Sequence, residues 1–307
     1  MAKIFTVLLQ LIFFILAAPF LSGFIAKIKN NLRMRKGAGI FQPYYNLAKL
    51  FSKAEVVSET ASWIFRASPF AVIASTLAAA CLIPVFIFSA PMHMMGDFLA
   101  LIFIFALGRF FMALAALDAG SPFGGMGSSR EMFISSLVEP ALCLVVFAVA
   151  LQFGSTDISV IGGMGAVPVS SVVAAIALLL IIIAETSRLP VDNQETHLEL
   201  TMIHEAMILE YSGRSLALIE LASYIKQMVW FFLLARLVFP IGLAGFISLA
   251  QGAGWILWYL ARIAVIAVIV ALIEVAAAKM RLFRAADFLG FAFVLGVIAV
   301  VCAILGV

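Results

Sequence analysis

The fold follows from residues 168–214, PVSSVVAAIALLLIIIAETSRLPVDNQETHLELTMIHEAMILEYSGR, in which a continuous apolar run precedes an acidic connection. Residues 168–185 have the composition of a helix that crosses a membrane. The carboxylates that follow are six in number: Glu185, Asp192, Glu195, Glu199, Glu205 and Glu210. Because ionisable groups near bilayer depth are costly and usually functional, this acidity indicates proton or ion handling at a membrane edge.

The same apolar character extends over the whole chain. Its 307 residues are 65% hydrophobic and 11% charged, whereas a soluble protein is about half apolar and a quarter charged. The apolar runs are continuous, which indicates helices rather than barrel strands. We expect an all-α polytopic membrane protein, one membrane domain over residues 1–307, with eight transmembrane helices. They are predicted at 4–26, 67–89, 97–117, 132–153, 168–185, 216–239, 255–278 and 286–306.

The basic residues predict the orientation. Fourteen of the 19 Lys and Arg residues lie in the alternate connections 27–66, 118–131, 186–214 and 279–285. The opposite connections contain none. Since cytoplasmic loops carry an excess of Lys and Arg, these four connections are predicted to face the cytoplasm, with both termini on the extracytoplasmic side. The net charge of +3 is therefore a topology signal and gives no indication of nucleic-acid binding.

Few residues could hold a cofactor. The three cysteines, Cys81, Cys143 and Cys302, are isolated within apolar runs, where cysteine usually acts as a small hydrophobic residue. There is no C-x-x-C pair, no His-rich cluster and no Gly-rich nucleotide loop. We expect no metal site, no cofactor and no catalytic residue in this chain.

The acidic connection has two interpretations. Asp192, Glu195 and Glu199 have a spacing that places them on one helix face, with Asp192 and Glu195 in capping-box positions. A solvated helix with acids near its N-terminus explains that spacing. However, apolar residues alternate with the acids, which favours a segment packed against the bundle or a partner. Burial and like charge would then raise the pKa values of the carboxylates and suit them to proton exchange.

A second polar segment covers Asp118 to Glu131 and is rich in glycine, with Glu139-Pro140 following in an apolar run. Glu139 could pair with an arginine of another helix or act as a proton relay. Further charges lie in or near the apolar runs: Arg109, Lys226, Arg236, Arg262, Glu220 and Glu274. Some of these must pair, because unpaired charge in hydrocarbon is disfavoured, but the sequence does not reveal the partners.

The first basic connection predicts an amphipathic interfacial helix. Gln42-Pro43-Tyr44-Tyr45 is followed by Leu47, Leu50 and Phe51 at helical spacing. Such a helix could bind anionic lipid, dock a soluble partner, or do both.

These segments together resemble the subunit-one family of respiratory complex I. The resemblance covers nearly the whole chain and depends on Gly39–Pro43, Ala67–Pro69, Gly127–Glu131 with Glu139-Pro140, and Ala184–Pro190 through Glu210–Gly213. Within this family, the sequence of Asp192–Glu205 most resembles that of the membrane-anchor subunit of group 4 NiFe hydrogenases, the formate hydrogenlyase and energy-converting hydrogenase type. Quinone-reducing members tend to have a G-P-N-R-type sequence where this chain reads Gly37–Pro43, which argues against a quinone pocket.

The resemblance implies a non-catalytic subunit of an ion-translocating oxidoreductase in a prokaryotic cytoplasmic (inner) membrane. Expected partners are soluble hydrogenase large and small subunits, an iron–sulfur protein, antiporter-like membrane subunits and membrane lipid. Iron–sulfur clusters and a nickel–iron centre belong to those partners. The resemblance assigns proton or sodium coupling to Glu139, Glu185, Asp192, Glu195, Glu199 and Glu210. We expect partner docking at Arg33, Arg35, Lys36, Gln42, Arg130, Glu131, Arg188 and Arg214.

Three other functions compete with this one. The quinone-site subunit of a complex I-type NADH:quinone oxidoreductase would admit a lipid-soluble substrate. A standalone transporter would use the same intramembrane charges, but no internal repeat supports it. A purely structural anchor would use its acidic connection only to bind basic partner surfaces.

Overall fold

The computed structural model describes residues 2–58, 60–85, 97–161, 168–192, 202–239, 249–278, 280 and 282–306, and these form helices joined by short connections. The only β-type pairing among them is an isolated bridge between Asp97 and Asp157. The helices are α1 (Ala2–Leu32), α2 (Gln42–Phe51), α3 (Trp63–Leu82), α4 (Phe98–Asp118), α5 (Pro122–Phe153), α6 (Val169–Glu185), α7 (His204–Ile208), α8 (Gly213–Val238), α9 (Leu249–Ala276) and α10 (Leu282–Leu305). The all-helical prediction is confirmed for this part of the chain.

Seven of these helices are long and apolar enough to cross a membrane: α1, α3, α4, α5, α8, α9 and α10. The eighth predicted span, α6, has 17 residues. At a rise of about 1.5 Å per residue it is somewhat shorter than a hydrocarbon core of about 30 Å. A multi-pass helical membrane protein is thus supported, while the count of eight and the sides of the termini stay predictions.

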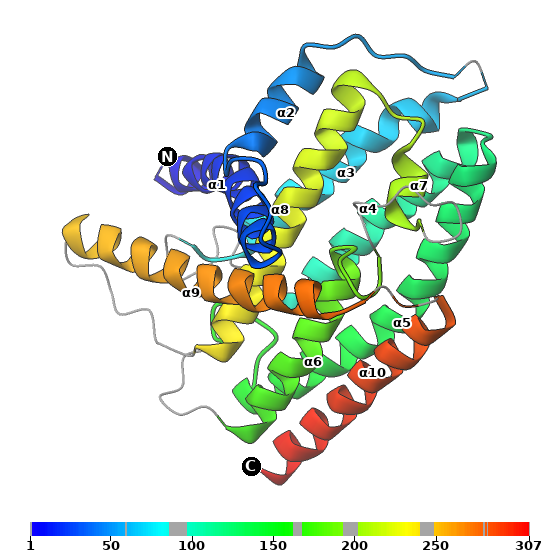
Figure 1. Cartoon of the computed structure of the whole chain (residues 1–307). Helices are drawn as coiled ribbons and strands as arrows, with labels where there is room; N and C mark the ends of the chain where they lie inside the picture. Colours follow the sequence, from blue (N-terminus) through cyan, green and yellow to red (C-terminus); the bar gives the residue numbers. More distant parts are fainter. Residues whose placement is uncertain are drawn as a thin grey trace.

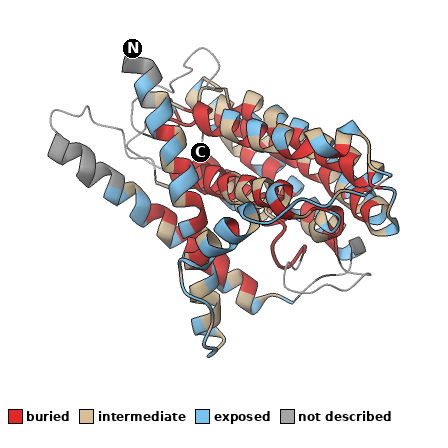
Figure 2. Ribbon diagram, turned by 90° about the horizontal axis from the view of Figure 1, so that it is seen from above, coloured by how far each residue is buried: buried red, intermediate tan, exposed pale blue. Residues whose placement is uncertain are grey.

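Helix α8 lies at the centre of the bundle. It contacts α1, α2, α3, α6 and α9, and its residues from Gln227 to Leu237 are all buried. Figure 1 shows α10 lying along α5 and α6, and α9 crossing α8. Exposed residues lie on the outer faces of the helices, as the colours of Figure 2 show. Apolar exposed residues are expected on a surface that faces lipid.

Helix α5 begins well before the apolar run at 132–153. The side chain of Ser121 accepts a hydrogen bond from Gly124 N, and Pro122 occupies the first turn, which are favourable features of a helix start. The glycines of residues 118–131, predicted to lie in a connection, instead permit close packing of helices. A Cβ on Gly127 would lie 2.9 Å from Ala206 Cβ and 3.0 Å from Ile203 O. The glycine-rich segment is therefore mainly the first turns of α5, fitted against α7.

The basic connection after α1 folds back onto the bundle. Its predicted helix is present as α2, with Leu47 buried and Phe41, Tyr45 and Phe51 exposed. The Tyr44 hydroxyl donates to the Leu16 carbonyl of α1. Further along, Ser212 Oγ accepts from Val56 N at 2.8 Å and donates to Val56 O at 3.0 Å. The connection is thereby attached at both ends, to α1 and to the start of α8.

Candidate functional site

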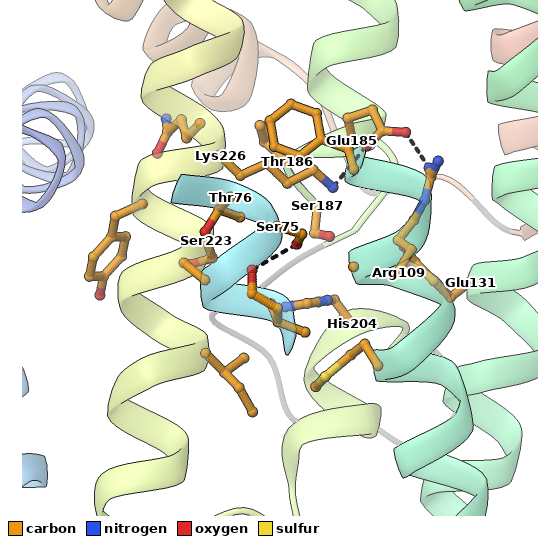
Figure 3. Close-up of a pocket in the computed structure, with 18 of the residues that line it drawn as sticks. Ser75, Thr76, Arg109, Glu131, Glu185, Thr186, Ser187, His204, Ser223 and Lys226 are labelled. Carbon is orange, nitrogen blue, oxygen red and sulfur yellow. Dashed lines mark hydrogen bonds and ion pairs between the residues drawn. The ribbon is translucent and has the colours of Figure 1, made fainter. Parts of the chain in front are cut away.

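Three helices bring buried charges together in the middle of the bundle. Arg109 of α4 donates from Nη1 to Glu185 Oε1, at the end of α6. Lys226 Nζ of α8 lies 2.8 Å from Glu185 Oε2. Figure 3 shows both contacts. The Glu185 side chain is 1% exposed, so its charge depends on these two cations for compensation.

The other face of Arg109 reaches the outer surface of α5. Its Nη2 donates to Glu139 Oε1 at 3.2 Å. The Glu139 side chain is 47% exposed, whereas Arg109 is 10% exposed. A carboxylate at the surface of a membrane-spanning helix is unfavourable against lipid. This position is therefore suited to a protein neighbour or to water.

A second set of charges begins at the next residue of α8. Gln227 Oε1 accepts from Arg188 Nη2 at 2.9 Å, and Arg188 Nη1 donates to Glu274 Oε1 of α9 at 2.8 Å. Lys29 Nζ of α1 lies 2.9 Å from Glu274 Oε2. Glu274 is thus held between a cation from α1 and one from the connection after α6.

The two sets lie next to each other, and we call them together the polar axis. They adjoin where Lys226 and Gln227 are neighbours in α8 and where Glu185 and Arg188 are three residues apart. Its members, in order, are Glu139, Arg109, Glu185, Lys226, Gln227, Arg188, Glu274 and Lys29. It contains three carboxylates and four cations, so a proton gained or lost at one member must redistribute the pairing of its neighbours.

A cavity of about 90 Å³ adjoins the polar axis. Since a water molecule needs roughly 10–15 Å³ on this measure, the cavity has room for several waters. Its lining contains members of the axis, three further titratable residues, Glu131, His204 and Tyr224, and six serine and threonine hydroxyls (Figure 3). These hydroxyls belong to Ser22, Ser75, Thr76, Thr186, Ser187 and Ser223.

Most of these hydroxyls donate to the backbone of their own segment. Ser75 donates to Val72 O at 2.8 Å, Thr76 to Ile73 O at 2.9 Å and Ser223 to Glu220 O at 2.8 Å. The lone pairs of the hydroxyl oxygens remain available as acceptors. The cavity lining can therefore orient water molecules by accepting hydrogen bonds from them. A water-filled cavity beside the axis can therefore connect Glu131 and His204 to Lys226 and Glu185.

The structure places the predicted acidic residues in different surroundings. Glu185 and Glu139 belong to the polar axis. Asp192 is buried, and its Oδ2 accepts from His204 N at 3.1 Å at the start of α7. It therefore positions the short helix that carries His204. Glu210 is exposed, whereas Glu195 and Glu199 lie outside the described residues, so their predicted capping box is not described.

The predicted docking residues also divide into two groups. Arg35, Lys36, Gln42 and Arg214 are exposed and Arg33 is partly exposed, as a docking surface requires. The remaining three point inward. Arg130 donates to Met202 O at 2.8 Å, Glu131 lines the cavity, and Arg188 is buried in the axis. Their geometry favours an internal role in organising the acidic connection.

Sequence reasoning left several residues of the axis unassigned. The sequence shows Arg109, Lys226 and Glu274 only as charges that need partners. It does not distinguish Lys29 from the other basic residues, and it assigns no role to His204. A usable signal did exist, because Arg109, Lys226 and Glu274 are ionisable residues inside apolar runs. The cavity had no sequence signal. Within the described residues, no group of three or more His, Cys, Asp or Glu side chains could hold a metal ion.

Comparisons with known proteins agree with one another. Residues 4–305 match the family model described as NADH dehydrogenase. Hydrogenase-4 component C of Escherichia coli (strain K12) is 37% identical over 247 residues, covering 79% of this chain and 78% of that protein. Formate hydrogenlyase subunit 4 of the same strain is 33% identical over 229 residues, covering 72% and 73%. NADH-quinone oxidoreductase subunit 8 of Rhodothermus marinus is 27% identical over 231 residues, covering 71% and 66%.

The fold has a solved counterpart. A chain in the structure of the membrane-bound sulfane sulfur reductase, an archaeal respiratory membrane complex, superposes with a TM-score of 0.82. The match covers 99% of this chain and 100% of that chain at 19% identity, so it shows the fold alone.

Proposed function

The chain belongs to the NADH dehydrogenase (complex I subunit 1) family, and on that premise we propose that it is the membrane-anchoring and coupling subunit of a multi-subunit group 4 NiFe hydrogenase complex. The names of two relatives, hydrogenase-4 component C and formate hydrogenlyase subunit 4, support this branch. The observation that carries the coupling role is the polar axis, two adjoining sets of paired charges that extend from Lys29 to the half-exposed Glu139.

We place the protein in the prokaryotic cytoplasmic (inner) membrane as a single domain with eight transmembrane helices, counting α6, and both termini outside. The clustering of Lys and Arg in alternate connections supports this orientation. The exposed basic residues near α2 and at the start of α8 then face the cytoplasm. Together with Gln42 they form the docking surface for the soluble large, small and iron–sulfur subunits, which hold the iron–sulfur clusters and the nickel–iron centre.

Coupling begins at the acidic connection. Asp192 fixes the start of α7, and α7 presents His204 to the cavity. Electron transfer in the docked arm changes the charge next to this connection, which includes Glu195, Glu199 and Glu210. A shift of α7 then changes the water and proton content of the cavity. No electron enters this subunit.

The proton moves along the polar axis because one cation can pair with two carboxylates. Arg109 serves both Glu185 and Glu139. When Glu185 gains a proton it loses most of its attraction for Arg109 and Lys226, and Arg109 then pairs more strongly with Glu139. Glu139 passes the change to an antiporter-like membrane subunit beside α5. The exposed carboxylate is the place where the axis meets that partner.

A quinone-site subunit of a complex I-type NADH:quinone oxidoreductase is the second candidate. It is favoured by the 27% identical NADH-quinone oxidoreductase subunit of Rhodothermus marinus. The cavity is smaller than the roughly 300 Å³ at which ligand clefts usually start, which favours water over a quinone headgroup.

Activity assays on the complex, purified through a tag on this chain, distinguish the hydrogenase subunit from the quinone-site subunit. Hydrogen evolution from a reduced low-potential donor, with nickel in the sample and no quinone reduction, is the expected result. Quinone reduction without nickel would assign the chain to the respiratory branch instead.

A further inference from the structure

The polar axis is not the only place where charge is buried in this bundle. Nearer the end that carries Asp97, where α8 ends, two arginines are almost fully enclosed: Arg236 of α8 and Arg262 of α9 are 8% and 5% exposed. The polar axis pairs each of its cations with an acceptor side chain, but these two arginines are held differently.

Neither arginine forms an ion pair with a carboxylate among the described residues. Arg236 donates to two backbone carbonyls, Ile161 O at 2.8 Å and Ser159 O at 2.6 Å. Arg262 donates to Phe239 O at 3.2 Å, and its Nε and Nη2 are buried without a hydrogen-bond partner in the described part of the chain. Arg236 also interacts electrostatically with Asp157 and Tyr259, so its charge is compensated in part.

Aromatic rings surround Arg262. Its guanidinium carbon lies 5.3 Å from the ring centre of Trp258, 5.7 Å from Phe239 and 5.8 Å from Tyr259. Ring faces compensate part of a cation's charge without a carboxylate. An arginine cannot be neutralised by losing its proton in a protein, so both positive charges are permanent.

Between the arginines and the polar axis lies a layer of packed aromatic side chains. On the side of α4, Lys226 Nζ is 5.9 Å from the Phe105 ring, which lies 5.3 Å from Trp230. On the side of α1 and α9, Phe232 lies 5.4 Å from Phe14 and stacks on Tyr259 at 4.9 Å. The exposure of Phe14, Phe105, Trp230 and Phe232 is at most 3%, so bulk water does not reach this layer.

We propose that this aromatic layer and the cations of Arg236 and Arg262 form a seal that stops protons in the polar axis from leaving toward the Asp97 end. The aromatic layer removes the water needed for proton transfer. The two arginines raise the energy of a cation that passes close to them, as an arginine does in channels that exclude protons. The consequence rests on the proposed function: a proton in the axis is kept from the Asp97 end and can move on sideways, at Glu139.

The test is the passive proton permeability of vesicles containing the intact complex, measured without substrate after an external pH jump with a trapped pH-sensitive dye. Arg262→Gln should raise the permeability at least about tenfold, the factor for one unit charge within roughly 10 Å at an effective dielectric constant of about 20. Arg262→Lys, which keeps the charge, should stay near the wild type. Arg66→Gln, which removes an exposed charge of α3, is the matched control.

Arg236→Gln tests the arginines, and Trp230→Leu tests the aromatic layer. With both variants available, the proposal can still be tested if one of them does not assemble. Each should leak more than Arg66→Gln at equal amounts of assembled complex. Permeability equal to the wild type in all assembled variants would overturn the seal. That failure is distinct from failure of the coupling role, because this measurement involves no turnover.

Discussion

Lys29 of α1 and Arg188 of the connection after α6 share one carboxylate: Glu274 lies 2.9 Å from the first and 2.8 Å from the second. Glu274 is 3% exposed, so it separates two cations that would otherwise repel each other in a low-dielectric interior. This arrangement joins α1, α9 and the acidic connection at one point.

Removal of this carboxylate should destabilise the protein strongly. Glu274→Gln leaves Arg188 and Lys29 close together without compensation, and we expect a loss of about 3–5 kcal/mol of unfolding free energy. Lys29→Gln alone should cost less, because Arg188 still pairs with Glu274. The double variant should recover part of the loss. Unfolding in detergent measures all three, and a double variant no more stable than Glu274→Gln would contradict the shared pairing.

The start of α8 depends on a glycine. Gly213 has φ of 53°, and a Cβ there would lie 2.6 Å from Ala54 O. Gly213→Ala should therefore destabilise by about 1–3 kcal/mol and expose residues 52–58 to protease. Gly125→Ala is the matched control, since a Cβ there meets nothing within 4 Å. In a helix that change should be neutral or stabilise by about 0.5–1 kcal/mol. Equal behaviour of both variants would refute this account of Gly213.

Tyr211 gives a pH-dependent prediction. Its hydroxyl donates to Phe65 O at 3.1 Å and its ring stacks on Phe65 at 4.1 Å. Burial raises the pKa of the phenol above its usual value of 10.0. The folded state therefore holds the proton more tightly, and this stabilisation is complete below pH 10 and lost as the pH rises from there through the folded pKa.

Tyr211→Phe should consequently cost about 0.5–1.5 kcal/mol at pH 8, the contribution of one hydrogen bond. The difference from the wild type should shrink above pH 10. Chemical unfolding at both pH values measures it, and a difference that grows with pH would have the wrong sign.

The membrane helices could be predicted because their signal is local. A bilayer demands continuous apolar runs, and each run is visible without knowledge of the others. The ends of the helices are harder to predict from the sequence. The glycines of residues 118–131 suggest a loop, but Gly127 is required by the approach of α7, a contact that no local pattern encodes.

The polar axis could be predicted only in part. The intramembrane charges Arg109, Glu139 and Glu185 are evident in the sequence as costly residues that need partners. Their pairing depends on how the helices pack, since Arg109 and Glu185 are separated by 76 residues. The cavity is further removed from sequence, because it is lined by residues of seven helices and the connection after α6.

Proton translocation by the Glu139→Gln variant tests the central claim most directly. The amide keeps a hydrogen-bond acceptor for Arg109 but cannot carry the charge, so the complex should assemble and retain bound nickel. In vesicles, hydrogen evolution should then occur without proton uptake or release across the membrane, or stall. Cys143→Ala, one turn further along α5 and also exposed, should translocate normally. Wild-type translocation per hydrogen by Glu139→Gln would contradict the account.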